Sequence, residues 1–165
     1  MSDAPPASPP TAGYGGSAVV TALVGGVFLM FGWPFAQWLL TPTGNPYSIE
    51  WTQGPLAGRP VAYFELTGGT AWRDLAQFAT GVVLLIEATL YAVLAFRPTT
   101  GRTPLALVLG LAGLGCLINL LSAAMQLWAG FYQPIFAIIG LAVCAVSGVS
   151  AWHRLRERMT ETRTI

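Results

Sequence analysis

The chain has no lysine and few charges of either sign. All eight basic residues are arginines, and Asp and Glu together number seven in 165 residues. Charged residues make up 9% of the chain, against about 25% in an ordinary soluble domain. So few charges cannot coat a water-facing surface, and much of the surface must therefore face lipid. With a net charge of +1 and no basic patch before the C-terminal segment, we do not expect nucleic acid as a partner.

Residues that commonly build catalytic, metal and haem sites are also scarce. The chain has one histidine, His153, and two cysteines, Cys116 and Cys144. Both cysteines lie in apolar runs, where we interpret them as small packing residues rather than parts of a disulfide framework. The motifs HExxH, CxxC and GxSxG and the Gly-rich phosphate loop do not occur in the sequence. We therefore expect no enzymatic activity, no cofactor and no metal site.

Long hydrophobic runs are what the sequence does contain. A helix needs about 20 residues to cross the hydrocarbon core of a bilayer. Pro104 and Pro134 stand where the third and fourth helices are expected to begin, a position that proline favours. Pro34 predicts a kink or an early end in the first run. We predict an all-α membrane protein in which residues 18–152 form a bundle of four transmembrane helices, at 18–40, 75–96, 105–127 and 134–152.

Three segments lie outside these runs. Residues 1–17, rich in Pro, Ala, Gly and Ser, predict a disordered tail, and residues 153–165 predict a basic tail. The outer segment 41–74 contains two candidate strands, at 47–52 and 61–67, which predict a small β-hairpin-like loop. This loop either caps its own bundle or offers another protein an aromatic surface, formed by Tyr47, Trp51, Tyr63 and Phe64.

The arginines predict the orientation in the membrane. Arg59 and Arg73 lie on the side of segment 41–74, diluted there by acidic residues, whereas six arginines lie on the side of both termini. Because cytoplasmic segments carry the excess of basic residues, both termini are expected in the cytoplasm. The exclusive use of arginine, with abundant Ala and Gly, is typical of GC-rich bacteria, so we expect a multi-pass protein of a bacterial plasma (inner) membrane. The six arginines are Arg97, Arg102, Arg154, Arg156, Arg158 and Arg163.

Polar residues within the second and third runs fall on single helical faces. The loop between the two runs is short, so the helices should be antiparallel neighbours. Aligning their ends places Ser122 and Gln126 near Thr80 and Gln77. We predict a polar seam between the two helices, with each hydrogen bond worth about 0.6 kcal/mol. Its members are Gln77, Thr80, Asn119, Ser122 and Gln126.

Small residues recur on several of the predicted helices. Gly140, Cys144 and Gly148 are spaced four residues apart in the fourth run, and Gly110 and Gly113 lie in the third. In lipid, where helices gain nothing from hiding apolar surface, such residues let backbones approach closely. We interpret these faces as helix-packing surfaces.

Glu87 lies inside the second hydrophobic run, with Tyr91 one turn further along the same face. An ionised carboxylate in the bilayer core costs at least about 2.5 kcal/mol, so without a counter-charge the neutral form is expected. The antiparallel counterpart of Glu87 in the third run is near Leu114, which offers no polar side chain. Three alternatives remain open: a structural hydrogen bond within the chain, pairing with a group of a partner subunit, or a site for a proton, an ion or a substrate.

These features predict two kinds of function. The first is a non-catalytic accessory or scaffold subunit of a larger membrane complex, either a lipid- or solute-import assembly or a respiratory complex. The missing catalytic motifs, the isolated Glu87 and the small-residue faces favour it. The second is a small homo-oligomeric, proton-coupled transporter that uses Glu87 and Tyr91. The expected partners are the lipid bilayer and larger membrane-protein subunits.

Overall fold

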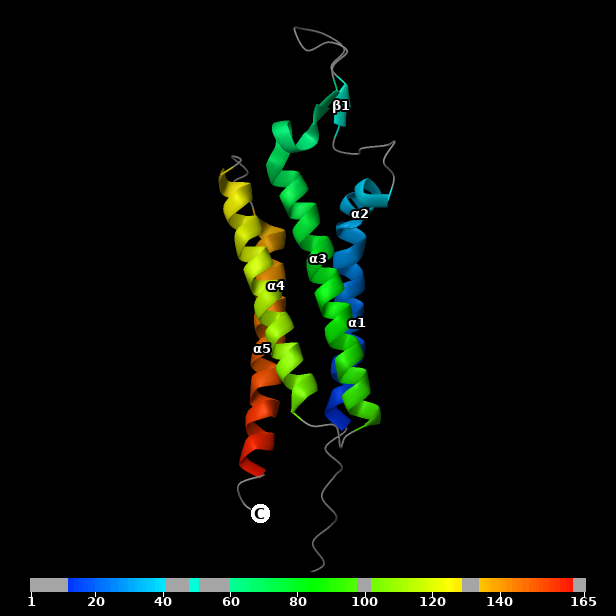
Figure 1. Cartoon of the computed structure of the whole chain (residues 1–165), viewed down its shortest axis with the longest axis vertical. Coiled ribbons are helices and arrows are strands. Elements are labelled where there is room, and N and C mark those ends of the chain that lie inside the picture. Colours follow the sequence, from blue (N-terminus) through cyan, green and yellow to red (C-terminus); the bar gives the residue numbers. More distant parts are fainter. Residues whose placement is uncertain (1–11, 41–47, 51–59, 98–101, 129–133, 162–165) are drawn as a thin grey trace, which may run out of the picture.

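The computed structural model describes residues 12–40, 48–50, 60–97, 102–128 and 134–161. Four of its helices are long and apolar enough to cross a membrane, which confirms the predicted four-helix membrane bundle (Figure 1). They are α1 (Ala12–Phe31), α3 (Tyr63–Phe96), α4 (Thr103–Trp128) and α5 (Ile135–Glu161).

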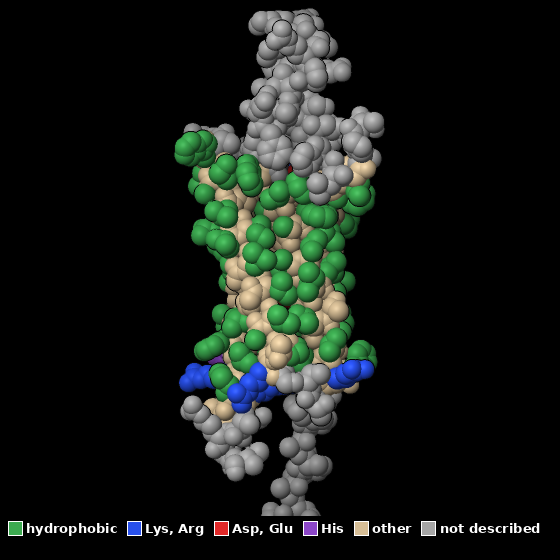
Figure 2. Space-filling model, in the orientation of Figure 1, with side chains coloured by type: hydrophobic (Ala, Val, Ile, Leu, Met, Phe, Trp, Pro, Cys, Tyr) green, Lys and Arg blue, Asp and Glu red, His purple; other side chains and the backbone are tan. Residues whose placement is uncertain are grey.

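Helix α3 is the centre of the bundle. Helix α1 packs along one side of it and α4 along another, while α5 packs mainly on α4 and touches α3 over a shorter stretch. Figure 2 shows hydrophobic side chains over the visible face of the helices, bounded at one end by arginine side chains. That end is where the chain enters α1 and leaves α5 (Figure 1). We call it the arginine-rich end.

The first predicted span is broken rather than continuous. Helix α1 ends at Phe31, and a second helix, α2 (Trp33–Leu40), follows after Gly32. The break lies just before Pro34, where the sequence predicts one, because proline has no N–H to donate and its ring clashes with the preceding turn. Gly32 is required there for a second reason, since a Cβ atom would collide with the backbone of Phe78 on α3.

The predicted outer loop differs from the described structure. Strands β1 (Ser48–Glu50) and β2 (Pro60–Ala62) form a three-residue antiparallel pairing. The predicted strand 61–67 is wrong beyond its first two residues, because α3 begins at Tyr63 and includes Phe64. A two-stranded ribbon is marginal in water, whereas extending the membrane helix satisfies the backbone locally. Tyr47 and Trp51 lie outside the described residues.

The predicted tail 1–17 is wrong over its last six residues, which form the start of α1. Tyr14 explains the difference, since its ring is buried against Tyr91 and Leu94 of α3. One aromatic anchor thus outweighs the composition of the segment, and residues 1–11 lie outside the described residues. At the other end, α5 continues as a helix to Glu161, into the predicted basic tail.

Glycines set the closest helix contacts. A Cβ at Gly81 of α3 would lie 2.9 Å from the carbonyl oxygen of Gly25 on α1. In α4, a Cβ at Gly115 would meet the Sγ atom of Cys144 on α5. Gly110 and Gly113 behave differently, because a Cβ on either would meet nothing within 4 Å. The small residues of α4 therefore divide into one face that packs on α5 and another that faces outward.

Candidate functional site

The predicted seam residues of α3 and α4 are all buried, with at most 3% of any of them exposed. Asn119 Nδ2 donates to Thr80 Oγ1 at 2.7 Å, which joins the two helices. Ser122 Oγ donates to the backbone carbonyl of Trp72 at 3.0 Å and accepts from Gln126 Nε2 at 2.9 Å. The partner of Thr80 is thus Asn119, whereas aligning the helix ends predicts Ser122. The register of α3 against α4 therefore differs by about one helical turn from that alignment.

Asn119 is placed by three helices. Its amide also donates to the carbonyl of Gly115 within α4, at 2.9 Å. On the α5 side it lies against Gly140, where a Cβ would collide with the Asn119 side chain. The missing side chain at Gly140 therefore makes room for an amide that ties α3 to α4. Four of the seam residues, Thr80, Asn119, Ser122 and Gln126, are thus hydrogen-bonded within the chain.

Glu87 is fully buried, and the structure gives it a partner on α5. Ser147 Oγ donates to Glu87 Oε2 at 2.5 Å. The other carboxyl oxygen, Oε1, is buried and has no hydrogen-bond partner within the described part of the chain. A structural hydrogen bond is therefore present, as the first alternative for Glu87 requires. A group from a partner subunit could reach the carboxyl only if the helices moved apart.

Tyr91 lies on the same face of α3 as Glu87, and only 2% of it is exposed. Its hydroxyl interacts with the side chains of Ser147 and Ser150 on α5. Ser147 thus stands between Glu87 and Tyr91. The four residues Glu87, Ser147, Tyr91 and Ser150 form a polar row that runs from the middle of the membrane toward the arginine-rich end.

At the arginine-rich end the row meets a cluster of two arginines and two tyrosines. The guanidinium of Arg154 lies 4.7 Å from the ring centre of Tyr14 and 5.5 Å from that of Tyr91. Arg154 Nη2 also donates to Ser17 Oγ on α1 at 2.8 Å. Arg158 lies 5.6 Å from the same Tyr14 ring. Arg154 therefore bridges α5 to α1 and α3, and cation–π attraction holds it there.

Between Arg154 and the opposite end, α1 and α5 are separated by a groove. It has a volume of about 680 Å³, and its lining includes Val20 and Val24 of α1, Leu84 of α3, and Val143 and Val146 of α5. Val20 and Val146 are 61% and 70% exposed, so the groove opens sideways toward lipid. Its polar groups come from Ser17, Thr21, Tyr91, Ser147 and Ser150.

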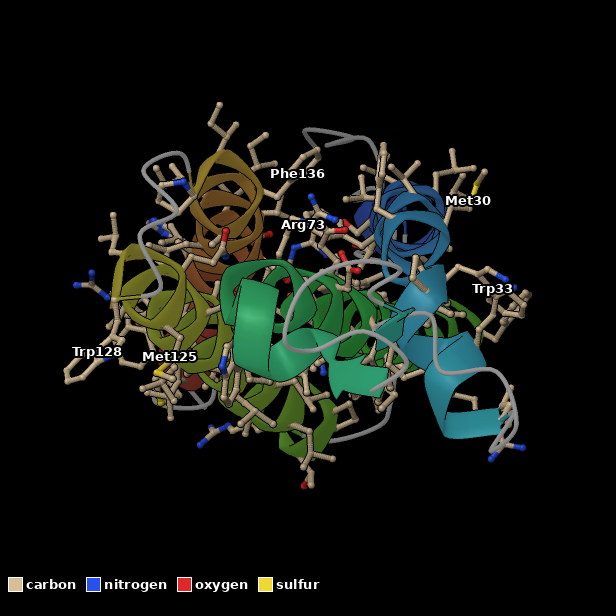
Figure 3. All side chains as sticks on the ribbon, turned by 90° about the horizontal axis from the view of Figure 1, so that it is seen from above. Met30, Trp33, Arg73, Met125, Trp128 and Phe136 are labelled. Carbon is tan, nitrogen blue, oxygen red and sulfur yellow. The ribbon has the colours of Figure 1, made fainter. Side chains whose placement is uncertain are left out.

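Beyond the groove, at the opposite end of the bundle, α1 and α5 meet through aromatic packing. Phe31 of α1 and Phe136 of α5 lie 5.3 Å apart between ring centres. Arg73 also lies at this end of the bundle, bound to Asp74 at 2.8 Å (Figure 3). Met30, Trp33 and Trp128 point away from the bundle in the same view. These outward side chains match the interfacial positions that aromatic residues favour in membranes.

The described residues hold no group of three or more His, Cys, Asp or Glu side chains that could bind a metal ion. Sequence reasoning missed Tyr14, Ser147 and Arg154. Tyr14 lies in the predicted tail, and the roles of the other two depend on which helix packs against α3. A spacing signal was available for Ser147 and Arg154, since they lie seven residues apart on one face of α5.

Fold and site together define an integral membrane protein with four candidate spans, a polar seam between α3 and α4, and a groove that opens toward lipid. Comparisons of the chain with protein-family models, with curated proteins and with solved structures found no match.

Proposed function

We propose that the chain is a non-catalytic subunit of a larger membrane complex, and that a transmembrane helix of another subunit packs against the outer face of α4. The complex would be a transport assembly for lipids or solutes, with a respiratory complex as the alternative host. The outward small residues of α4 carry the proposal, and the paired interior supports it.

The outer face of α4 has the form of a helix-packing surface without a helix on it. Ala106, Gly110, Gly113 and Leu117 follow at spacings of four, three and four residues, which places them on one side of a helix. All four are exposed, and no atom lies within 4 Å of the Cβ positions of the two glycines. Small residues at such spacing let a second backbone approach closely.

The interior supports a structural role. Asn119, Ser122 and Gln126 all bond to groups of the chain itself, and Ser147 bonds to Glu87. Polar side chains that are consumed in holding helices together are not free to bind a substrate.

The proposed location is the plasma membrane of a bacterium, with both termini in the cytoplasm. Five arginines among the described residues lie at the arginine-rich end, whereas Arg73 at the other end is paired with Asp74. The positive-inside rule then favours the cytoplasmic side for the arginine-rich end. The five are Arg97, Arg102, Arg154, Arg156 and Arg158.

The test is co-purification from native membranes in a mild detergent, with a variant of the α4 face. The wild-type chain should elute with one or more larger membrane proteins in fixed ratio. Gly110→Leu combined with Gly113→Leu should release them, because the added side chains keep a partner backbone away. Gly26→Leu on α1, another glycine with open space around it, is the matched control. Recovery of the wild type only as a monomer or homodimer would contradict the proposal.

A second candidate function is a small homo-oligomeric, proton-coupled carrier that uses Glu87. One observation favours it: the unpartnered Oε1 of Glu87 lies at the inner end of the polar row of Ser147, Tyr91 and Ser150. Glu87 is therefore less isolated than its own helix suggests. Intramembrane carboxyl groups at such positions commonly belong to proton pathways.

Proton flux into liposomes containing the purified protein tests this candidate. A potassium gradient with valinomycin supplies the driving force, and a trapped pH-sensitive dye reports the flux. A carrier predicts flux that Glu87→Gln abolishes while the helix content stays unchanged. Ser122→Ala, in the seam, should retain the flux. Wild-type liposomes no leakier than empty ones would exclude an uncoupled proton path through Glu87.

A further inference from the structure

We propose that the groove between α1 and α5 binds an anionic phospholipid, with one acyl chain along the groove and the phosphate at Arg154 and Arg158. The lipid would come from the leaflet at the arginine-rich end. No residue of α4 lines this groove, so the site stands independently of the proposed partner face.

The shape and chemistry of the groove fit an acyl chain. Its walls are formed mainly by valine and by the small residues glycine, alanine, serine and threonine, so a flexible hydrocarbon chain can lie close to the backbone. Along α1 the lining runs from Gly13 to Val24. At 1.5 Å per residue this is about 16 Å, close to half of the roughly 30 Å hydrocarbon core. The groove thus spans one leaflet, from its interface to the bilayer centre.

The ends of the groove give the lipid a direction. The inner end, at Val24 of α1 and Ala142 and Val143 of α5, is lined by apolar side chains, which suit a methyl terminus. The near end holds Arg154, which donates to Ser17 and lies over Tyr14 and Tyr91. A lipid in the groove therefore has its tail toward the bilayer centre and its headgroup at the arginines.

The charge at the near end favours an anion. Arg154 and Arg158 both lie over the ring of Tyr14, so two positive charges stand close together. No carboxylate forms an ion pair with Arg154 within the described part of the chain. Its Nη1 is buried there without a hydrogen-bond acceptor. A phosphate oxygen would supply that acceptor and reduce the repulsion between the two guanidinium groups.

A neighbouring transmembrane helix is the other occupant to consider. A helix with side chains is about 10 Å across, too wide to settle between α1 and α5 while Arg154 and the Phe31–Phe136 pair join their ends. An acyl chain requires no such separation. These two contacts, one at each end of the helices, therefore favour the lipid.

Native mass spectrometry of the whole protein in detergent tests the site, with phosphatidylglycerol and phosphatidylcholine of identical acyl chains as probes. Phosphatidylglycerol should bind at least about fivefold more tightly, the factor that corresponds to about 1 kcal/mol for one basic side chain near a lipid surface. Arg154→Gln should remove this preference, and Arg154→Lys should restore most of it. Arg156→Gln removes an exposed arginine of the same helix and should leave the preference unchanged.

The groove itself is tested without touching the arginines. Gly16 lines it, and a Cβ there would meet nothing within 4 Å, so Gly16→Leu fills the groove without a clash. This variant should weaken binding of both lipids, whereas Gly26→Leu should not. The proposal is overturned if the two lipids bind equally, if Arg156→Gln acts like Arg154→Gln, or if Gly16→Leu has no effect. A photo-crosslinker at Val146 that captures a protein instead of a lipid would also overturn it.

Discussion

Ser147 on α5 donates a hydrogen bond to Glu87 on α3 across 60 positions of sequence. The bond joins two helices that share only a short stretch of contact, because α4 lies between them in the chain and along much of their length. It also changes the interpretation of Glu87. End-to-end alignment of the α3–α4 hairpin pairs Glu87 with Leu114, so a search confined to that hairpin finds no partner for the carboxyl group.

Replacing Ser147 by alanine is expected to destabilise the bundle by about 1 kcal/mol, because both carboxyl oxygens of Glu87 would then be buried without a donor. Val149→Ala, at an exposed position of the same helix, should change stability much less. Unfolding in mixed micelles with increasing dodecyl sulfate, followed by circular dichroism, measures both variants. Equal effects would mean that the bond between Ser147 and Glu87 adds nothing to stability.

The Asn119–Thr80 bond allows a sharper measurement by a double-mutant cycle. Asn119→Ala and Thr80→Ala should show a coupling of about 0.6 kcal/mol, with about 1.7 kcal/mol as the upper end for membrane proteins. Thr89 is the control, since its hydroxyl bonds within α3 to the carbonyl of Leu85. A cycle of Asn119→Ala with Thr89→Ala should give a coupling near zero. Indistinguishable couplings in the two cycles would argue against a direct bond.

Gly81 is expected to tolerate no side chain. A Cβ there would lie 2.8 Å from the backbone nitrogen of Leu29 and 2.9 Å from the carbonyl oxygen of Gly25. Backbone atoms cannot rotate away, so Gly81→Ala must push α1 off α3, at a cost of about 1–3 kcal/mol. Gly26 follows Gly25 on α1, and a Cβ there would have no atom within 4 Å, so Gly26→Ala should be neutral or slightly stabilising. Thermal unfolding in detergent compares the two, and matching stabilities would show that α1 and α3 are farther apart.

Whether a feature of the fold or the site could be predicted from the sequence depends on how far apart in the chain the interacting residues lie. The four spans follow from local hydropathy, and the break near Pro34 follows from the chemistry of one residue. The seam residues could be identified because the helical repeat alone shows which residues share a face, whatever helix packs against that face. The register of the seam was not predictable, because the Asn119 amide that bonds to Thr80 also packs against Gly140 of α5.

The errors have physical causes of the same kind. Segment 61–67 contains residues that favour strands, among them Val61, Tyr63 and Phe64, but it directly precedes an apolar helix and is part of that helix from Tyr63 onward. Residues 12–17 have the composition of a linker, yet Tyr14 finds a tertiary site on Tyr91. The groove between α1 and α5 could not be predicted from the sequence, because it depends on how two helices far apart in the chain contact each other near their ends.

The direction of the chain through the membrane can be checked with four single cysteine variants and a membrane-impermeant maleimide. Thr103 and Thr160 are exposed at the arginine-rich end, whereas Leu40 and Trp128 are exposed at the opposite end. If the positive-inside rule orients the protein, Leu40→Cys and Trp128→Cys react in intact cells, while Thr103→Cys and Thr160→Cys react only after permeabilisation. The native thiols should not react, because Cys144 is buried and Cys116 lies within the span of α4.

An even number of crossings between the two members of each pair requires them to behave alike. Opposite reactivity of Thr103→Cys and Thr160→Cys would mean that α4 and α5 do not both cross, and the four-span bundle would then be wrong. Reversed reactivity of the two pairs would keep the bundle and overturn only the cytoplasmic placement of the arginine-rich end.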